Sequence, residues 1–443
     1  LIPGESGSAD TLFIEGKLKV TDRVTWSFDL SGDSTGLSSK NDMVMINGDL
    51  VIEGTQTISI NIPDDSLQTG SYTLISYSGD FQGKLDSISV TGISGIPWEI
   101  YDTGQAINIR FLKTRNPATL VWKGGIPNDW DLVKNLNWTR EGESDWFVPY
   151  DTVLFTDEGT EHTSVTLVGD LYAGLVKLDA QGDYLFSGSG SISGTCGILK
   201  KGAGTLRIEN TNDYTGPSLI YDGTIEIAGL MTSGEAGPLG AGSGSAENLV
   251  LDGGTLRITS SSSSDRNMRM GPGNGTLEIT GEEFRMHGSL SGEGQVIKTG
   301  SGTLVWQIPN SHKGGTLLKE GRIHLGTEEA NQHGPEPGTL ILENATLSMI
   351  DNKNSSTNDC DWNLFVPGGY VGWIDLDSRC TLTGRLEGSG TLNLNIPFIR
   401  SYLSGDWSAF EGRINTTAKT SGGNFLVGGS SGFGKAHIHL GDY

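Results

Sequence analysis

Basic residues, cysteine and proline are all scarce in this chain of 443 residues, which contains 30 Lys and Arg, 3 Cys and 14 Pro. Proteins that bind DNA or anionic lipid need clusters of Lys and Arg. A formal net charge of −23 without such clusters argues against nucleic acid and against an anionic membrane surface as partners. Three cysteines are too few for a disulfide-dependent fold, and their spacing fits no zinc motif. The low proline content, without a Gly-x-y period, excludes collagen.

Long apolar stretches are missing as well. No run approaches the roughly 18 apolar residues of a membrane span, and no apolar pattern at helical spacing lasts for three turns. The chain begins at Leu1 without a methionine, a charged n-region or an apolar h-region, and it ends at Tyr443 on a strand-like run. We therefore expect a fragment or mature product of a longer polypeptide, with any targeting signal outside these residues.

Glycine, by contrast, is abundant: its 66 residues are about twice the ordinary usage. Short apolar runs, such as Thr205 to Ile208 and Thr224 to Ile227, stand between clusters of Gly, Asn, Asp and Ser. Strands favour β-branched or aliphatic residues at alternate positions, and glycine supplies the positive φ angles of tight corners. A strand and a corner about every 8 to 12 residues predict an all-β chain.

The chain contains an internal repeat. Residues 192–227 return without a gap as residues 290–325, with 12 of 36 positions identical at an offset of 98. Chance at this composition would give roughly two or three identities. A looser third copy begins at Gly384-x-Leu386-x-Gly388, and Gly412-Arg413-Ile414 matches Gly321-Arg322-Ile323. The sequence therefore predicts a repeat protein.

The length of the repeat predicts the architecture. A unit of this size accommodates roughly four coils of a β-helix, each of some 20 to 25 residues, and the coils must stack because one coil cannot bury its inward face alone. We predict an all-β, right-handed parallel β-helix of about three units behind an N-terminal β module, with tandem β-sandwiches as the alternative. The expected parts are residues 1–117 (N-terminal β module), 118–245 (Trp-rich cap and first unit), 246–335 (second unit) and 336–443 (third, truncated unit).

Three local features refine this prediction. Trp122, Trp130 and Trp138 stand where the solenoid is expected to begin, and we interpret them as a plug over its open core, with a sugar-stacking platform as the alternative. The serine tract Ser260 to Ser264 and the insertion Asp351 to Trp362 predict loops. Cys360 and Cys380, 20 residues apart, could pair across neighbouring coils.

The repeated segments also resemble a known family. The stretches KKGAGTL (200–206) and KTGSGTL (298–304), with Asn212-x-Tyr214-Thr215-Gly216 and Gly223-Thr224 after the first, resemble the autotransporter-associated β-strand repeat family. The likeness is specific through residues 118–330, whereas no Lys-x-Gly-x-Gly follows Gly388 in the third unit. The resemblance implies a secreted or surface-displayed β-helical passenger, or a stalk attached to a polysaccharide-degrading module, in a Gram-negative bacterium. It carries over no catalytic residue.

Residues that could support chemistry are few, and no G-x-S-x-G, Walker or H-E-x-x-H motif is present. Asp375 and Asp377 share one face of a strand, either as ligands for Ca²⁺ or as a solvated face beside Arg379. His437 and His439 also share a face, with Asp442 near, and are either a transition-metal pair or isolated imidazoles.

One further motif superficially resembles the acid motif of a hydrolase. It is Asn210-Thr211-Asn212-Asp213, which aligns with Ile308-Pro309-Asn310-Ser311 in the second copy, so that a corner is the better interpretation. We therefore predict no catalytic, cofactor-binding or metal-binding residue and no cofactor.

The sequence as a whole favours a non-catalytic extracellular β-solenoid that extends or displays another domain, or presents a surface to a partner. We expect it outside the cell or at the outer-membrane surface of a Gram-negative bacterium. Its expected partners are other domains of a longer polypeptide or surface proteins, with polysaccharide as a further candidate. One alternative is a β-helical polysaccharide lyase or glycoside hydrolase, which needs several carboxylates and a base in one groove. The second is an adhesin or glycan-binding module, which needs coplanar exposed aromatic rings.

Overall fold

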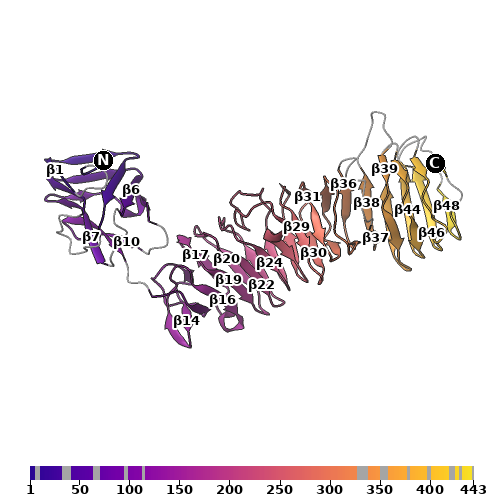
Figure 1. The fold of residues 1–443 in the computed structure, drawn as a ribbon, viewed down its shortest axis with the longest axis horizontal. Helices are drawn as coiled ribbons and strands as arrows, with labels where there is room; N and C mark the ends of the chain where they lie inside the picture. The colour runs from indigo at the N-terminus through magenta and orange to yellow at the C-terminus, as the bar shows by residue number, and fades with distance from the viewer. Residues whose placement is uncertain are drawn as a thin grey trace. The chain divides into compact units, whose positions relative to one another are not determined.

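The computed structural model describes residues 1–4, 10–31, 41–62, 70–93, 98–111, 115–326, 338–349, 358–376, 380–396, 401–418, 425–428 and 432–441 (Figure 1). In these ranges the regular structure is β-strand, apart from the short 3-10 helices Leu85–Ser87, Asp157–Gly159 and Ala246–Asn248. The described residues contain no helix of the length and apolarity needed to cross a membrane. The chain divides into two compact units, Leu1–Pro117 with Val148–Tyr150, and Ala118–Phe147 with Asp151–Tyr443.

The first unit is a short coil with three strands per turn. Each turn contributes one strand to each of three sheets, and the strands of successive turns pair in parallel. An antiparallel hairpin, β10–β11, completes the largest sheet against β7. The sheets contain, in order, β1 (Thr11–Glu15), β4 (Met43–Asn47), β7 (Gly70–Tyr77), β11 (Ala106–Phe111) and β10 (Trp98–Asp102); β2 (Leu18–Thr21), β5 (Leu50–Glu53) and β8 (Phe81–Gln82); and β3 (Thr25–Asp29), β6 (Gln56–Asn61) and β9 (Ile88–Thr91).

The second unit is a longer solenoid with two extended sheets that begin at its N-terminal end. The ten-stranded sheet is β15 (Glu143–Asp145), β14 (Trp138–Arg140), β12 (Thr119–Trp122), β16 (Thr152–Thr156), β19 (Leu175–Asp179), β22 (Ile198–Lys201), β24 (Ser218–Ile220), β26 (Leu249–Leu251), β29 (Met268–Met270) and β32 (Leu290–Gly292). The twelve-stranded sheet is β13 (Asp129–Trp130), β17 (Ser164–Leu167), β20 (Tyr184–Ser187), β23 (Thr205–Ile208), β25 (Thr224–Ile227), β27 (Thr255–Ile258), β30 (Gly275–Ile279), β33 (Val296–Thr299), β35 (Thr316–Leu318), β37 (Thr339–Leu342), β40 (Asn363–Val366) and β43 (Leu386–Gly388).

A third side of the solenoid is formed first by β18 (Asp170–Leu171) and β21 (Ser191–Ile192), and later by a nine-stranded sheet. That sheet is β28 (Ser262–Ser264), β31 (Glu283–Met286), β34 (Thr303–Trp306), β36 (Arg322–Leu325), β38 (Ala345–Met349), β41 (Val371–Asp375), β44 (Thr391–Ile396), β46 (Arg413–Ala418) and β48 (His437–Leu440). In the last coils a four-stranded sheet takes the place of the ten-stranded one: β39 (Asn358–Cys360), β42 (Cys380–Leu382), β45 (Ser401–Leu403) and β47 (Phe425–Val427).

Parallel pairing runs through the whole second unit (Figure 1). Apart from the antiparallel β12–β14–β15 segment, its described strand pairs are parallel. Parallel strands in one sheet need crossover connections, whereas β-sandwiches are built from antiparallel sheets. The predicted parallel β-helix is therefore confirmed, and tandem sandwiches are excluded for this unit.

Alternate residues of each strand point inward and stack in register. Leu206, Ile225, Leu256 and Leu277 are neighbours on successive strands of the twelve-stranded sheet, and all four are fully buried. Such columns join into one continuous core from Leu120 to Ile414. Because the core is built coil upon coil, each coil is stabilised mainly by its two neighbours.

The two copies of the repeat lie on different sides of the solenoid. β22 belongs to the ten-stranded sheet, but its copy β33 belongs to the twelve-stranded one. In the same way, β23 belongs to the twelve-stranded sheet and its copy β34 to the nine-stranded one. From β22 to β32 the chain makes four complete coils and then continues to the next side. The offset of 98 residues is therefore four and one-third coils, or about 23 residues per coil. Gly194, Gly292 and Gly388 lie at or just after the ends of β21, β32 and β43, which belong to three different sheets, so these glycines also move from side to side. Gly321 and Gly412 precede β36 and β46 of the same sheet and therefore lie on one side.

The tryptophans at the start of the solenoid form its end plug. Trp122, Trp130 and Trp138 are fully buried, with the ring centroid of Trp138 4.8 Å from that of Trp122 and 5.5 Å from that of Trp130. Phe155 contacts all three rings. Buried rings cannot stack against a sugar, so the platform interpretation is wrong for these three residues.

Two predicted loops contain strand residues. Ser262 to Ser264 form β28 and pair with β31, because a parallel ladder requires only backbone groups. Ser264 is buried, and its Oγ donates to the Met231 O at 2.8 Å. Within the insertion, Asn358 to Cys360 form β39, and residues 350–357 lie outside the described ranges. Cys360 and Cys380 form no disulfide: β39 pairs Cys360 with Leu382, and the Cys380 Sγ lies 2.9 Å from the Met349 Sδ.

Candidate functional site

A buried lysine is the centre of each copy of the repeat. Lys200 and Lys298 are fully buried, although they are charged residues on inward-facing strand positions. The Lys200 Nζ donates to the carbonyl oxygens of Lys201, Gly202 and Asp222 at 2.9, 2.5 and 3.2 Å. The Lys298 Nζ donates to those of Thr299, Gly300 and Glu320 at 2.7, 2.7 and 3.1 Å. Each ammonium thus fixes two corners of successive coils by satisfying three backbone acceptors, one for each of its protons.

Burial controls the protonation of these lysines. It lowers the pKa of Lys298 to about 8, although Glu320 and Glu278 favour the charged form. Below pH 8 the ammonium is charged in the folded and the unfolded chain, so its desolvation penalty is fully present. Between pH 8 and the ordinary lysine pKa of about 10.4, the folded chain loses this proton while the unfolded chain keeps it, so stability rises with pH.

We expect the loss of unfolding free energy caused by Lys298→Met to increase from pH 7.5 to pH 10. The increase should be on the order of 1 to 3 kcal/mol, because only the wild type gains stability when its buried lysine deprotonates. Urea unfolding at several pH values measures this difference. Lys313→Met, at an exposed lysine paired with Glu293, should show little change with pH. If the free-energy loss caused by Lys298→Met became smaller as the pH rises, the pKa of Lys298 in the folded chain would lie above its ordinary value. The three carbonyl groups would then stabilise the charged form more than water does.

The glycine at the following corner is required by the same arrangement. Gly223 has a φ of +60°, and a Cβ there would lie 2.4 Å from the Gly202 O and 2.5 Å from both the Gly204 O and the Lys200 Nζ. Its copy Gly321 has a φ of +72° and equally close backbone neighbours. Glycine is therefore needed for space as well as for conformation.

Two alanine substitutions separate these effects. Gly169 has a similar φ of +73°, but a Cβ there would meet no atom within 4 Å. We expect Gly169→Ala to cost about 1 kcal/mol, from the left-handed conformation alone. Gly223→Ala should cost about 1 to 3 kcal/mol more, because the methyl group overpacks a backbone corner. Equal losses in denaturant unfolding would show that the corner relaxes around the methyl group.

The motif Asn210 to Asp213 forms a corner of the solenoid. Asn212 is fully buried, its Oδ1 accepts from the Ile192 backbone N at 2.9 Å, and its Nδ2 donates to the Pro238 O. The copy Asn310 accepts from the Leu290 N at 2.8 Å. Two positions later, Tyr214 pairs with Ser218 and its copy His312 with Thr316. These buried side chains replace the ladder hydrogen bonds of a corner that has no strand, and a solvent-facing catalytic role does not fit them.

Arg266 is a structural residue that the sequence patterns do not indicate. It is buried, and its guanidinium donates to the carbonyl oxygens of Leu239 and Gly240 at 2.9 and 2.6 Å. The adjacent Asp265 accepts from the backbone N of Ser233 at 2.7 Å. Both residues therefore hold residues 228–248, an insertion between β25 and β26, against the side of the solenoid. Two adjacent residues, Asp265 and Arg266, form no recognisable pattern in the sequence, so only the contacts in the folded chain reveal their role.

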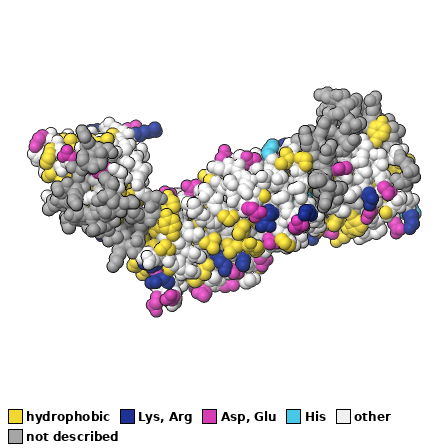
Figure 2. Space-filling view, in the orientation of Figure 1, with side chains coloured by type: hydrophobic (Ala, Val, Ile, Leu, Met, Phe, Trp, Pro, Cys, Tyr) yellow, Lys and Arg dark blue, Asp and Glu magenta, His cyan; other side chains and the backbone are white. Residues whose placement is uncertain are grey.

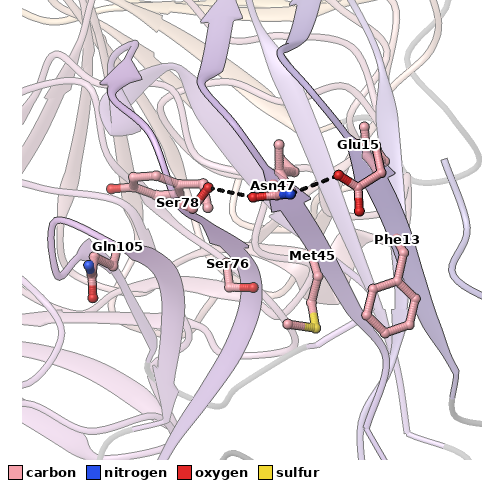
Figure 3. A pocket seen from close by; sticks show the side chains of 10 residues that line it. Phe13, Glu15, Met45, Asn47, Ser76, Ser78 and Gln105 are labelled. Atoms are coloured by element: carbon pink, nitrogen blue, oxygen red, sulfur yellow. Dashed lines mark hydrogen bonds between the residues drawn. The ribbon is translucent and has the colours of Figure 1, made fainter.

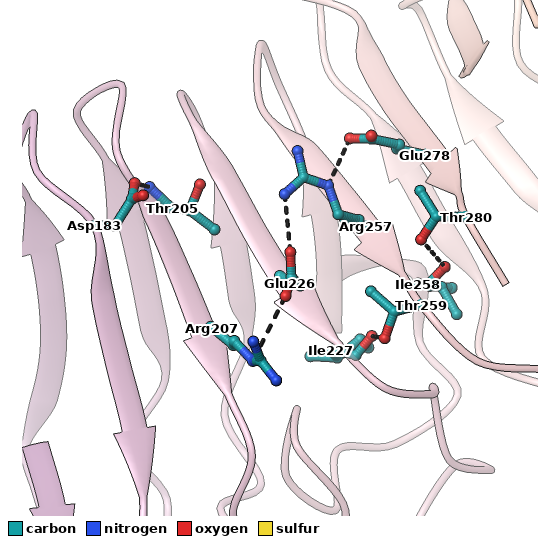
Figure 4. Close-up of polar contacts among 10 residues, drawn as sticks. All are labelled: Asp183, Thr205, Arg207, Glu226, Ile227, Arg257, Ile258, Thr259, Glu278 and Thr280. Carbon is teal, nitrogen blue, oxygen red and sulfur yellow. Dashed lines mark hydrogen bonds and ion pairs between the residues drawn. The ribbon is translucent and has the colours of Figure 1, made fainter. Parts of the chain in front are cut away.

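A row of alternating charges crosses the outer face of the twelve-stranded sheet (Figure 4). Arg207, Glu226, Arg257 and Glu278 are register neighbours on four successive strands. Glu226 lies 3.6 Å from the Arg207 Nε and 2.8 Å from an Arg257 nitrogen, and Arg257 lies 2.8 Å from Glu278. Figure 2 likewise shows basic side chains next to acidic ones on the visible face of this unit. Exposed pairs contribute about 0.2 to 1 kcal/mol each, so the row mainly favours the correct strand register.

The first unit has a shallow hollow on the outer face of its five-stranded sheet (Figure 3). It has a volume of 440 Å³ and is bordered by Phe13 and Met45, whose side chains are 70% and 37% exposed. Asn47 joins two sides of it by donating to Glu15 at 2.8 Å and accepting from Ser78 at 3.2 Å. The hollow has no buried charged group that would select a ligand.

The two candidate metal sites have different surroundings. Asp375 is buried and accepts from the Arg322 Nη1 at 2.7 Å and from the Asn395 Nδ2 at 2.6 Å, so its charge is already compensated. Asp377 and Arg379 lie outside the described residues. His437 and His439 are exposed on β48 opposite Arg413 and Asn415, and Asp442 is outside the described residues. The described residues contain no group of three or more His, Cys, Asp or Glu arranged to hold a metal ion.

Several carboxylates that stand close to other acidic residues in the sequence are bound to local partners. Asp131 accepts from the backbone of Asn135 at 3.0 Å, and Asp157 accepts from the backbone N of Gln181 at 2.7 Å. Glu283 pairs with Arg285 on the same strand at 2.6 Å. Asp64 and Asp65 lie outside the described residues.

Known proteins share the repeated segments. A profile of the Passenger-associated-transport-repeat family matches residues 198–227 and 296–325. These segments contain Lys200 and Lys298 with the carbonyl groups that they bind, an arrangement that we call the lysine clamp. The adhesin BmaC autotransporter of Brucella suis biovar 1 (strain 1330) is 35% identical over 164 residues, which are 36% of this chain and 5% of that protein. This chain therefore covers only a small part of that relative's length. No solved structure matches the chain.

Proposed function

The chain carries repeats of the autotransporter-associated family, and from this premise we propose that it is a rigid spacer that holds another domain of a longer polypeptide away from the cell. The predicted location, outside the cell or at the outer-membrane surface of a Gram-negative bacterium, is confirmed by the repeats and by the autotransporter relative. The relative also supports a surface passenger with an adhesin-like role.

The observation that carries the proposal is the uninterrupted core of the second unit. One cluster of buried side chains continues from Leu120 to Ile414 through stacked parallel coils. Each coil advances the solenoid by the distance between parallel strands, about 4.8 Å. Within the described residues this core is continuous, and a continuous core resists bending, which is the property that a spacer needs. The lysine clamps add corner contacts between coils, and the charge row helps to fix their register.

Deleting whole repeats tests the spacer role. Removal of residues 199–296 joins Ile198 to Ile297, which is a matched position in the second copy. The shortened chain should fold and should be shorter by about 20 Å, since four and one-third coils are lost. Electron microscopy or small-angle scattering measures this length. Removal of residues 199–295, one residue fewer, should prevent folding downstream of the junction, because a shift of one residue turns inward side chains outward.

The same deletion in the complete displayed polypeptide distinguishes a spacer from a binding element. A spacer deletion should change only the reach of what lies beyond it. A specific ligand-binding activity that disappears although the shortened chain folds would contradict a spacer role for these coils.

We also expect the chain to be catalytically inactive on acidic polysaccharides. Hydrolysis needs a proton donor and an acceptor at a fixed separation, and a lyase needs a base with a cation that neutralises the uronate. The carboxylates of Asp131, Asp157, Glu283 and Asp375 are bound to local partners instead. Purified chain should release no reducing ends and no unsaturated uronates from pectin, alginate or glycosaminoglycans, with or without calcium. Turnover of one of these polymers that Asp375→Asn abolishes would favour the enzyme alternative.

A further inference from the structure

The outer face of the last coils carries a regular grid of polar and aromatic side chains. Outward positions on β41, β44, β46 and β48 are in register along three parallel rows. Figure 1 shows these strands stacked at the C-terminal end of the second unit, where β44, β46 and β48 are labelled. The rows are Val371, Thr391, Arg413 and His437; Trp373, Asn393, Asn415 and His439; and Asp375, Asn395 and Thr417.

The charge of this grid differs from that of the chain. The chain has a net charge of −23, but the grid contains one carboxylate, Asp375, which is paired with Arg322 at 2.7 Å. Arg413 is exposed, and within the described residues it pairs with no carboxylate: its Nε donates to the Asn415 Oδ1 at 2.7 Å. His437 and His439 lie beside it and are also exposed. Arg413 is therefore a cation of the grid that no described carboxylate compensates, and it can pair with an anionic ligand.

The polar side chains of the grid are ordered by hydrogen bonds within and between the rows. Asn415 receives the bond from Arg413 and donates through its Nδ2 to the Asn393 Oδ1 at 2.8 Å. In the next row, Thr417 donates to Asn395, which donates to Asp375 at 2.6 Å. Pre-ordered amides and a guanidinium lose little side-chain entropy when they bind a ligand, so they favour specific binding.

The grid contains one indole ring rather than the coplanar aromatic set expected of a glycan-binding module, so its polar rows carry most of the proposed contacts. Trp373 lies between Thr346 and Asn393 in register and is partly exposed, unlike the buried tryptophans of the end plug. An aromatic face packs against the apolar C–H face of a sugar, while amide and guanidinium groups bond its hydroxyl and carboxylate oxygens. The rows repeat every coil, about 4.8 Å, which is comparable with the length of one sugar residue in an extended chain.

We infer that this grid binds an acidic polysaccharide of the uronate type, with the sugar chain lying along the solenoid axis. Trp373 packs against a sugar ring, Asn393 and Asn415 bond hydroxyl groups, and Arg413 neutralises a uronate carboxylate beside His437 and His439. The grid contains one carboxylate, Asp375, which is paired with Arg322, so it lacks the carboxylate pair of a glycoside hydrolase. The site does not depend on the spacer role: the spacer proposal is tested by length, and this one by affinity.

Titration calorimetry of the intact chain with oligogalacturonates tests the inference. We expect Trp373→Ala and Arg413→Gln each to weaken binding at least tenfold, and Trp373→Tyr to retain most of it. The affinity should fall between 50 and 500 mM salt, with a slope of log affinity against log salt concentration on the order of one released ion per neutralised charge. Arg413→Gln should reduce this slope. Neutral malto-oligosaccharides should bind much more weakly than oligogalacturonates.

Two variants control for loss of an aromatic ring or a charge elsewhere. Phe365 is an outward, partly exposed residue of the twelve-stranded sheet, and Arg285 is an exposed residue of β31, in an earlier coil of the same nine-stranded sheet as the grid. Phe365→Ala and Arg285→Gln should leave the affinity within twofold, and thermal unfolding verifies that all variants fold. The inference is overturned if oligogalacturonates do not bind at millimolar concentration, if neutral sugars bind equally well, or if folded Trp373→Ala and Arg413→Gln bind like the wild type.

Discussion

Replacing Trp130 by alanine should reduce the free energy of unfolding by about 3 to 5 kcal/mol, the usual range for a large aromatic residue lost from a core. Trp130 is fully buried, and its ring contacts those of Trp138, Phe147, Phe155 and Phe186 at centroid distances of 5.4 to 6.0 Å. No later coil can replace these contacts, because they lie at the start of the solenoid. Chemical denaturation measures the loss.

The position of the damage is a second readout of the same variant. Amide exchange should accelerate first in β16 and β17, next to the plug, while β38 and β41 keep their protection. Trp146→Ala is the matched control, because Trp146 lies in the same region but is 38% exposed; it should cost less than about 1 kcal/mol. If Trp130→Ala were no more harmful than this control, the aromatic cluster would not be the plug.

Replacing Leu206 by alanine should cost about 2 to 5 kcal/mol, because the smaller side chain leaves a cavity in a close-packed column. Leu206 is fully buried on β23 between Tyr184 of β20 and Ile225 of β25. In a stack of coils, the loss should be concentrated in these three strands. Hydrogen exchange should therefore detect faster opening near Leu206 and little change near Leu392, which is also buried but lies in a distant coil.

Leu219→Ala provides the comparison for the same residue type. Leu219 occupies an outward, partly exposed position on β24, so its truncation leaves no internal cavity and should cost clearly less than Leu206→Ala. Exchange that accelerates equally along the whole chain after Leu206→Ala would show that the solenoid unfolds as a single cooperative unit. That result would contradict the coil-by-coil view of its stability.

Much of the fold was predictable because it depends on short-range patterns. Alternating apolar residues at Leu206 and Ile208 require one buried strand face, and Gly223 requires a corner with positive φ. A repeat that cannot bury its face alone requires stacking. The tryptophan plug follows from the same reasoning, since an open core end must be covered. These inferences need only the chemistry of neighbouring residues, and the structure agrees with them.

Features that depend on distant contacts were not predictable in this way. Serine residues at 262–264 form a strand because the backbone of β31 is beside them, whatever their side chains. Lys200 and Lys298 are identical repeat residues in the sequence, but only the three carbonyls around each ammonium explain why a lysine is buried there. Arg266 likewise acquires its role from carbonyls 26 and 27 residues away.

The sequence by itself determined that this protein is a stack of β-coils with a 98-residue repeat, because strand alternation and glycine corners are local properties. Only the tertiary structure decided that the repeat spans four and one-third coils, so that successive copies face different directions. It also decided which outward residues meet: Trp373, Asn393 and Asn415 are about one coil apart in sequence and form no motif. They become neighbours because parallel pairing brings the same position of each coil into register.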